Sequence, residues 1–417
     1  MGKFSPVVQA PRYMQEFKCV GSSCVENCCT GWRVAIDKPT YQQYQTVKVE
    51  PLAGMLKQHV KKSRDSASGG YAAIELKPTQ ACPFLDEARL CQIHAGLGAQ
   101  ALSVTCNEYP RVYTEDGDAQ GLVASLSCPE AARLALSSAD ALDPVDLTLG
   151  FANRSLVPVR RRRTKADPAE VDLVRKHAQL IGGALEAVVR QPNLGAAQAL
   201  VYGGVLLRLV AKLAERPLPE AEAGLEQAFG QYLNPQALAR APQLVSGLAV
   251  PKEVQLDLLM GATRRYVAEH GGRPSFKALV DDLREGLQLG ADSDPALSLQ
   301  RYVEAEQQVF APFDAAHPHV LKNYLLNALM SSLLPRTGRA ELEADFMALA
   351  VRFALIKFFL IGLAARADRP FGVEDCIRVV YVIARNIEHN RAFMPNVLDT
   401  LRERDALRLE VLATLVL

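Results

Sequence analysis

Eight of the nine cysteines in this 417-residue chain lie in its first third, and this cluster limits the possible folds more than any other feature. An even spread would place only about 2.4 cysteines in the same window. The eight residues are Cys19, Cys24, Cys28, Cys29, Cys82, Cys91, Cys106 and Cys128. The ninth, Cys376, lies far away beside apolar residues, and we expect an ordinary core or surface thiol there.

The cellular compartment decides whether clustered cysteines form disulfides or stay reduced. The segment from Met1 to Pro6 lacks the apolar stretch and the cleavage site of a signal peptide, so we expect a cytoplasmic protein. Thiols stay reduced in the cytosol, and clustered cysteines there favour metal ligation or redox chemistry over disulfides. A disulfide-stapled domain is the alternative, and it would need an export route.

The first group of cysteines has an unusual spacing. It reads Cys19-x4-Cys24-x3-Cys28-Cys29. The group contains neither the Cys-x2-Cys pair of compact zinc sites nor the Cys-x3-Cys-x2-Cys triplet of radical enzymes. We expect the adjacent Cys28 and Cys29 to point in different directions, so that one of them faces a second site or the core.

The second group is spread widely along the chain, and its members can meet only through folding. It comprises Cys82, Cys91, Cys106 and Cys128, with His94 as a further candidate ligand. Two of these cysteines precede proline, which suits cluster ligation because bacterial ferredoxins also end their ligand run with Cys-Pro. The spacing therefore predicts a thiolate-bound centre that draws on both groups, and leaves zinc and iron–sulfur open.

The last 250 residues or so have a different composition, rich in alanine and leucine. One apolar stripe, at helical spacings of three and four, runs through Val171, Val174, Ala178, Ile181, Leu185 and Val188. Asp167 and Pro168 supply an N-cap and a first-turn proline for this helix. Similar patterns predict helices near 195–215, 218–232, 253–269, 274–289, 296–310, 319–334, 340–366, 373–390 and 396–415.

These two regimes predict a mainly α protein with two domains. We expect an irregular cysteine-rich metal-binding domain over residues 1–140, a basic linker over 141–168 and an all-α helical domain over 169–417. The linker contains the run from Arg160 to Arg163. Within the first domain we expect a strand over 32–37, a helix over 41–47, a loop over 61–70, and a strand or helix over 121–127.

Charge and hydropathy exclude two classes of partner. The net charge of +1 gives no global field for nucleic acid. The most apolar stretch, Met347 to Ala365, contains Arg352 and Lys357, and each such charge would cost a few kcal/mol at a bilayer centre. We therefore expect a buried helix rather than a membrane span.

Other candidate binding residues lie close to the cysteines. Trp32 follows Gly31 and is either a core residue or a ring on which a ligand stacks. Arg111 follows the Tyr109-Pro110 turn and is either solvated or placed to bind an anionic ligand. No glycine-rich phosphate loop follows a strand, so a Rossmann-type nucleotide site has no support.

Several motifs resemble those of the flagellin lysine-N-methylase family. In the first 135 residues they are Cys19-Val20-Gly21-Ser22-Ser23-Cys24, Cys28-Cys29-x-Gly31-Trp32, Cys82-Pro83-Phe84-Leu85, Cys106-x2-Tyr109-Pro110-Arg111 and Ser127-Cys128-Pro129-Glu130. In the helical half they are Asn323-Tyr324-Leu325-x-Asn327 and Arg385-Asn386-Ile387-Glu388-His389-Asn390. The cysteine half also resembles a wider group of zinc- or iron-chelating cysteine-cluster domains.

The resemblance implies methyl transfer from S-adenosylmethionine to lysine side chains of flagellin by an enzyme with a [4Fe-4S] cluster. The eight clustered cysteines are the matching positions, and the resemblance does not say which four bind. A lysine amine must be neutral to attack a methyl sulfonium, so the site needs desolvation or a base. Our candidates for the base are Tyr109, Asp37 and Glu130, while Trp32 and Arg111 are candidates for binding the cofactor.

Two other functions fit the same residues. One is a non-enzymatic zinc- or iron-binding module whose helical half docks a partner. The other is a redox or iron sensor without a methyl donor. In each case the helical half is a natural docking surface for a long helical partner.

Overall fold

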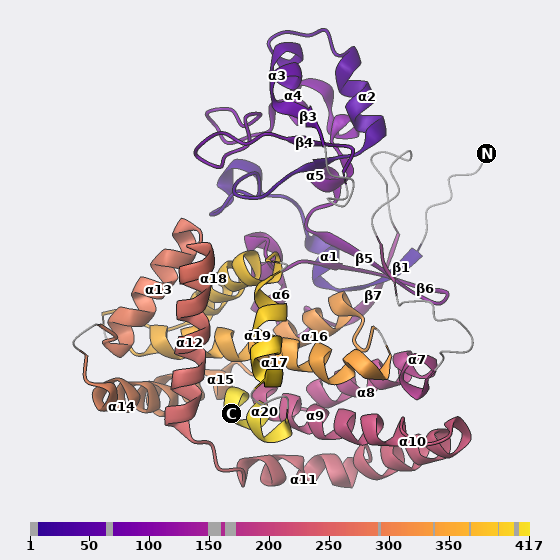
Figure 1. The fold of residues 1–417 in the computed structure, drawn as a ribbon, viewed down its shortest axis with the longest axis vertical. Coiled ribbons are helices and arrows are strands. Elements are labelled where there is room, and N and C mark those ends of the chain that lie inside the picture. The colour runs from indigo at the N-terminus through magenta and orange to yellow at the C-terminus, as the bar shows by residue number, and fades with distance from the viewer. Residues whose placement is uncertain are drawn as a thin grey trace.

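The protein consists of a small cysteine-bearing lobe, a five-stranded sheet and a large helical body (Figure 1). The computed structural model describes residues 7–63, 70–148, 160–162, 172–290, 293–336, 338–366, 368–390, 392–403 and 408–417. Most of these residues are helical, which confirms the expected mainly α fold. The metal-binding role of the first domain stays a prediction.

The small lobe packs short helices on a three-stranded antiparallel sheet of order β2-β4-β3. Its strands are β2 (Ala35–Ile36), β3 (Val60–Lys62) and β4 (Ala72–Ile74). Its helices are α2 (Lys38–Thr46), α3 (Leu52–His59), α4 (Gln92–Leu97) and α5 (Val104–Glu108), with 3-10 turns η1 (Gly21–Ser23) and η3 (Ala99–Ala101). Ile36, Leu56 and Phe84 are fully buried in its core. The strand expected over 32–37 is thus reduced to two residues, and the helix expected over 41–47 begins earlier.

The second sheet has the order β7-β1-β6-β5-β8 and joins the lobe to the helical body. Its strands are β1 (Val7–Pro11), β5 (Arg111–Asp116), β6 (Ala119–Ala124), β7 (Pro144–Thr148) and β8 (Arg160–Arg162). The hairpin β5–β6 is antiparallel, while β1 pairs with β6 and β8 with β5 in parallel. β7 and β8 lie in the range we expected to be a linker. Arg163 and the helix start at Asp167 lie outside the described residues.

The helical body begins with α7 and contains no strand within the described part of 172–417. Its helices are α7 (Leu173–Lys176), α8 (Ala178–Val189), α9 (Ala196–Leu213), α10 (Leu218–Tyr232), α11 (Pro235–Ser246), α12 (Lys252–His270), α13 (Pro274–Leu287), α14 (Pro295–Ala305), α15 (Ala311–Ala316), α16 (His319–Ser332), α17 (Arg339–Ala364), α18 (Val373–Ile383), α19 (Phe393–Glu403) and α20 (Leu409–Val416). Two π-helical turns, η5 (Glu306–Phe310) and η6 (Ala384–Glu388), extend α14 and α18. Two helices, α11 and the short α15, lie outside the expected ranges, and Pro235 and Pro242 hide the apolar stripe of α11. The single helix expected over 396–415 is divided into α19 and α20.

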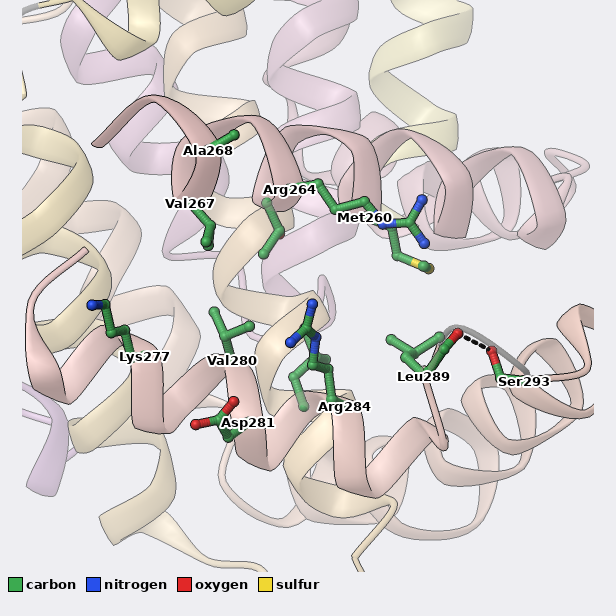
Figure 2. Close-up of a pocket in the computed structure, with 13 residues that line it drawn as sticks. Met260, Arg264, Val267, Ala268, Lys277, Val280, Asp281, Arg284, Leu289 and Ser293 are labelled. Carbon is green, nitrogen blue, oxygen red and sulfur yellow. Dashed lines mark hydrogen bonds between the residues drawn. The ribbon is translucent and has the colours of Figure 1, made fainter. Parts of the chain in front are cut away.

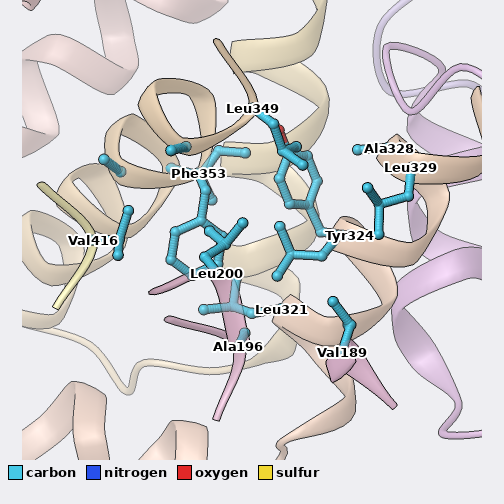
Figure 3. Close-up of a cluster of buried hydrophobic side chains, with 14 of the residues drawn as sticks. Val189, Ala196, Leu200, Leu321, Tyr324, Ala328, Leu329, Leu349, Phe353 and Val416 are labelled. Atoms are coloured by element: carbon cyan, nitrogen blue, oxygen red, sulfur yellow. The ribbon is translucent and has the colours of Figure 1, made fainter. Parts of the chain in front are cut away.

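Helix α17 forms the centre of the helical body. Its Phe353 packs beside Leu200 of α9 and Tyr324 of α16 (Figure 3). By length and hydropathy α9 and α17 could each cross a membrane, but 89% of the apolar window of α17 and 61% of that of α9 are buried inside the protein. The charge of Lys357 within α17 is balanced by Glu306, whose Oε1 lies 2.7 Å from Nζ.

The buried side chains form two clusters that divide the chain differently from the expected domains. The smaller cluster contains only residues of the small lobe. The larger one continues from the helical body into β1, α1 (Tyr13–Glu16), the β5–β6 hairpin and α6 (Pro129–Ser137). The five-stranded sheet is therefore packed as part of the helical body.

Buried amides of α16 fix this junction. Asn327 Oδ1 accepts a hydrogen bond from Tyr13 Oη at 2.7 Å, and its Nδ2 donates to the carbonyl of Ala124 at 3.1 Å. Asn323 Nδ2 donates to the carbonyls of Ala135 and Ser138. The Asn323-x3-Asn327 motif thus satisfies backbone groups at the ends of β6 and α6, which sets the register of the sheet on the helices.

The substitution Tyr13→Phe tests this junction. It removes the donor to Asn327 Oδ1 and the acceptor of the Ala124 N–H, which lies 2.9 Å from Tyr13 Oη. Leaving two buried polar groups unpaired should lower the free energy of unfolding by about 2 to 4 kcal/mol. Urea denaturation followed by circular dichroism measures the loss, with Tyr71→Phe, an exposed tyrosine, as the control. Equal midpoints for the two variants would contradict the assignment.

Candidate functional site

Main-chain pairing brings the two groups of cysteines together. The Cys82 N–H donates to the carbonyl of Cys29 at 2.8 Å, and the Gly31 N–H donates to Gln80 at 2.8 Å. These bonds align the segment after the first group antiparallel to the segment before Cys82. A second bridge pairs Leu85 with Cys91. Cys29 and Cys82, 53 positions apart in sequence, are thereby brought next to each other in the small lobe.

Four thiols from separate segments belong to the core of the small lobe. Cys82 is buried there, and Cys29, Cys91 and Cys106 pack against it. Their charges would interact, because Cys82, Cys91 and Cys106 each raise the pKa of at least one other member of the set. Burial raises the pKa of Cys82 to about 11 and that of Cys106 to about 12. All nine cysteines of the chain are free thiols in the structure.

Cys28 lies between this set and the remaining cysteines. Its thiol accepts a hydrogen bond from the thiol of Cys29. Cys29 packs against the core of the small lobe and Cys28 does not, so the expected difference in direction between the two side chains stays a prediction. The thiol–thiol hydrogen bond, assisted by the Arg385 guanidinium, lowers the pKa of Cys28 to about 7, and it raises the pKa of Cys29. On the other side Cys24 and Cys128 lie within electrostatic range of Cys28.

The four thiols suit an iron–sulfur cluster better than a single zinc ion. Among the described residues no three histidine, cysteine or acidic side chains are spaced to hold one metal ion. A single zinc ion needs four ligands within about 2.3 Å, so the arrangement does not single out a mononuclear site. An iron–sulfur cluster binds its cysteines at different irons and therefore accepts thiols that are farther apart. Four desolvated thiols, with no competing carboxylate or imidazole in the set, suit a cluster by their chemistry.

A pocket of about 1090 Å³ lies beside the cysteines. Its lining joins the cysteine loop to the ends of α12, α13 and α18, which Figure 1 shows next to the small lobe. Its lining comes from residues within 25–33, 78–80, 266–275 and 381–390. The first two ranges flank the cysteines. The last two are the α12–α13 turn and the π-helical turn η6, and η6 contains most of the Arg385-to-Asn390 motif. Parts of the chain some 350 residues apart thus build one site.

Two arginines of the helical body hold the cysteine loop against this pocket. Arg385 donates to the carbonyls of Glu26 and Asn27, and it is 4% exposed. Arg273 donates to the carbonyls of Thr30 and Gly31 at 2.8 and 2.9 Å. Gly31 has a φ of +72°, and a Cβ there would lie 3.0 Å from the Arg273 guanidinium. The glycine is therefore required both by the backbone and by the close approach of Arg273.

The π-helical turn places these arginines. Asn386 Nδ2 donates to the carbonyl of Val382, while its Oδ1 accepts from the Arg273 N–H at 3.2 Å. Tyr266 of α12 donates to the carbonyl of Asn386 at 3.0 Å. π-helical turns widen a helix and are frequent at functional sites. Here the turn links α18 to the α12–α13 turn, so that both arginines face the cysteine loop.

A polar and aromatic cluster joins two residues of the pocket lining, Trp32 and His389, to Tyr109 and Ser127 behind them. His389 Nε2 lies 2.8 Å from Ser127 Oγ, which is also 3.0 Å from Tyr109 Oη. The ring of Trp32 lies 5.4 Å from that of Tyr109 and 6.4 Å from that of His389. Trp32 Nε1 donates to the carbonyl of Cys28, which ties the indole to the cysteine loop. The pKa of Tyr109 is raised by burial and by Cys128, so its phenol stays neutral.

Glu26 contributes a carboxylate to the pocket. Its Oε1 accepts from Ser275 Oγ at 3.1 Å and lies 3.4 Å from Arg385 Nε. Its Oε2 is closed to solvent and has no hydrogen-bond partner among the described residues. An unsatisfied buried carboxylate oxygen beside a cavity is an acceptor available to a bound group.

The predicted site residues divide into those near the pocket and those away from it. Trp32 lines the pocket, and Tyr109 lies behind it. Asp37 is the N-cap of α2 and accepts from the N–H groups of Thr40 and Val104. Glu130 pairs with Arg133, and Arg111 lies over the Phe17 ring. His94 is exposed on α4. The last four residues do not line the pocket, and their predicted roles stay predictions.

Several residues of the pocket were not expected from the sequence. They are Glu26, Tyr266, Arg273, Arg385, Asn386 and His389. One signal was available: the polar run that starts at Arg385 directly follows the apolar stretch Ile377–Ile383, an unusual place for a buried charge. For Glu26 and Arg273 the sequence offered no pattern.

Comparison with known proteins gives consistent matches. Residues 187–415 match the family of FliB lysine N-methylase C-terminal domains. The lysine-N-methylases of Salmonella choleraesuis and Salmonella typhimurium are each 23% identical over 98% of this chain and 99% of their own length. The flagellar biosynthetic protein FliU of Salmonella muenchen is 34% identical over 32% of this chain and 80% of its own length. No solved structure matches the chain.

The lowered pKa of Cys28 predicts how it reacts in metal-free protein. A thiolate forms above a lowered pKa, so alkylation of Cys28 by iodoacetamide should rise between pH 6 and pH 8 with a midpoint of about 7. Alkylation of Cys82, whose pKa is raised to about 11, should still be increasing above pH 9. Peptide mass spectrometry at each pH measures both rates.

The variant Cys29→Ala is the control for this experiment, because it removes the hydrogen-bond donor to Cys28. Its midpoint at Cys28 should move upward. A wild-type midpoint near the ordinary thiol value of about 8.5 would contradict the thiol–thiol bond.

Proposed function

Because the chain belongs to the FliB lysine N-methylase family, we propose that it is a methyltransferase that modifies lysine side chains of a flagellar protein. Flagellin is the proposed substrate and S-adenosylmethionine the proposed methyl donor. The match over nearly the full length of two lysine-N-methylases supports the reaction class, and the likeness to FliU supports the flagellar link. We place the protein in the cytoplasm, where its free thiols would stay reduced.

The observation that carries the proposal is the pocket shared by the cysteine loop and the helical body. Its volume of about 1090 Å³ is slightly above the usual range of small-molecule sites, which suits a nucleoside-sized donor together with the end of a lysine side chain. The rings of Trp32 and His389 offer faces to a positively charged sulfonium or ammonium group. Glu26 offers a carboxylate to the same space.

The chemistry sets what these residues must do. The lone pair of the lysine nitrogen forms a bond to the methyl carbon while the carbon–sulfur bond breaks and its electrons stay on sulfur. The attacking amine must first lose a proton, which is easier in a desolvated site with other cations nearby. The guanidiniums of Arg273 and Arg385 supply this positive surrounding. Holding the two reactants in line can lower the barrier by about 7 to 11 kcal/mol.

Glu26 is the proposed acceptor of the lysine proton. Its Oε2 has no partner, whereas its Oε1 is held by Ser275 and Arg385. Tyr109 is less suited to this task, because its raised pKa makes the phenol a poor source of phenolate. Its hydrogen bond to Ser127 instead orients the partner of His389. Asp37 and Glu130 do not line the pocket.

A [4Fe-4S] cluster is the proposed metal centre. Cys29, Cys82, Cys91 and Cys106 would hold it, because they share the core of the small lobe and come from four segments. When bound, the cluster would supply a thiolate cross-link between these segments, and its irons could act as Lewis-acid or redox centres. The same lobe carries Trp32 and Glu26, so the ligation of these four cysteines would fix one wall of the pocket.

The cluster assignment predicts four sensitive cysteines. Replacing Cys29, Cys82, Cys91 or Cys106 singly by serine should reduce the iron and sulfide content per chain. It should also weaken a broad absorption band at about 400 nm in anaerobically purified protein. Cys19→Ser and Cys376→Ser are controls, because one thiol is exposed and the other is buried in the helical body. Unchanged iron in all four variants, or a colourless protein with stoichiometric zinc, would contradict the assignment.

The methylation itself is tested by producing flagellin together with the protein. Intact mass spectrometry should show increases of about 14 Da per methyl group, located on lysines. The variant Glu26→Gln keeps the shape of the side chain and should lower the methylation rate at neutral pH by about 100-fold or more. Glu75→Gln, an exposed change in the same lobe, should leave the rate unchanged.

The outcomes separate the two parts of the proposal. Flagellin of unchanged mass with wild-type protein would overturn the proposed reaction. Methylation at the wild-type rate by Glu26→Gln would overturn only the role of Glu26. Iron content of the variant, measured in parallel, shows whether the cysteine loop has stayed in place.

A further inference from the structure

Helices α12 and α13 border a groove of about 740 Å³ on the helical body (Figure 2). The two helices follow each other in the chain and run alongside each other, with side chains from both facing the space between them. Met260 and Val267 line it from α12, while Val280 and Leu283 line it from α13. Leu289 closes the end far from the α12–α13 turn.

The rim of the groove is basic. Arg264, Lys277 and Arg284 are exposed along it, against the single acidic residue Asp281, which gives the groove a net charge of +2. Figure 2 shows Arg264 and Arg284 facing the groove from opposite helices. None of the three cations has a side-chain hydrogen bond or an ion pair among the described residues. On another face of α13, by contrast, Asp282 binds both Arg366 and Arg378.

The groove leads to the proposed active site. Ala268 and Lys277 mark the end of the groove next to the α12–α13 turn. Gly272, Arg273 and Ser275 of that turn line the pocket that contains Glu26. A chain bound in the groove and leaving it at this end would therefore arrive at the mouth of the pocket.

We propose that the α12–α13 groove binds an acidic amphipathic helix of the protein substrate and so delivers a neighbouring lysine to the pocket. The apolar floor matches a stripe of residues at helical spacing, and the unpaired cations match carboxylates beside that stripe. α13 has 14 residues, so an occupant of about 10 to 14 residues would span the groove. This inference rests on the proposed function and adds to it how the substrate is selected.

A charge-reversal variant tests the groove. The triple variant Arg264→Glu, Lys277→Glu and Arg284→Glu leaves the pocket lining unchanged. The matched control is Lys212→Glu, Arg216→Glu and Arg240→Glu, which makes the same change in charge at exposed positions elsewhere on the helical body. Circular dichroism and iron content show whether both variants fold.

The first readout is kinetic. With flagellin as substrate, the groove variant should raise KM at least about tenfold while kcat changes little, and the control should keep wild-type values. A short unstructured lysine peptide cannot use the groove, so all three proteins should methylate it equally. An unchanged KM for flagellin in the groove variant would overturn the inference and leave the proposed reaction intact.

The second readout does not depend on methylation. The probe is a fluorescent 18-residue peptide with leucines at helical spacing and glutamates elsewhere, and fluorescence anisotropy measures its binding to the full chain. Wild-type and control proteins should bind it, the groove variant should bind at least about tenfold more weakly, and added salt should weaken binding. A matched peptide with lysines in place of glutamates should not bind.

Each other result of the binding experiment counts against the inference. Equal affinity of the two peptides, or no binding of the acidic peptide by the wild type, would overturn it even if flagellin is methylated. A wild-type dimer that the groove variant converts to a monomer, detected by sedimentation, would assign the groove to a second copy of the chain. Conversely, acidic-peptide binding lost only in the groove variant supports the groove even if flagellin is not methylated.

Discussion

The site depends on the hydrogen bonds by which Arg273 and Arg385 fix the cysteine loop, which has little apolar packing of its own. The segment from Cys24 to Trp32 has no fully buried apolar side chain, and four of its carbonyls are bound by guanidiniums of the helical body. Hydrogen bonds from a charged donor contribute about 1.5 to 3 kcal/mol each, and a buried guanidinium left without acceptors would be costly. The loop and the helices therefore stabilise each other. Without this contact neither Trp32 nor Glu26 would face the pocket.

The helical body can bury Arg385 because carbonyl groups and the Glu26 carboxylate accept hydrogen bonds from or pair with its guanidinium. The π-helical turn η6 interrupts the regular ladder of α18, and Asn386 uses its side chain to hold both Val382 and the Arg273 backbone. The Asn323 and Asn327 amides play a corresponding part at the junction of β6 and α6. The two motifs of the helical half thus have one physical task in common: they satisfy polar backbone or side-chain groups where the cysteine-bearing third of the chain meets the helices.

The cysteines fall into two environments. Cys29, Cys82, Cys91 and Cys106 share the core of the small lobe, whereas Cys128 packs against the larger cluster at the start of α6. Pro129 follows Cys128 as the first residue of that helix, which explains this Cys-Pro pair without a metal. A single centre drawing on all eight thiols is thus not required by the fold. The α12–α13 turn links the α12–α13 groove to the pocket, and the cysteine loop links the pocket to the thiol set.

The sequence by itself determined the helices and the chemical character of the first third. Apolar periodicity is a local property, so it predicted most helices of the body, including the burial of α17. It missed α11, where prolines disturb the stripe, and the short α15. The concentration of cysteines likewise indicated where a centre could form. The tertiary structure alone decided which thiols share a core, that β7 and β8 join the sheet, and that the pocket lies between the lobe and the helices. The contacts responsible join Arg273 to Thr30 and Arg385 to Glu26, across 243 and 359 residues. Gly31 and the polar run at Arg385 are local signs of these contacts, but neither identifies the distant segment that the guanidinium binds, because a backbone carbonyl is present at every residue.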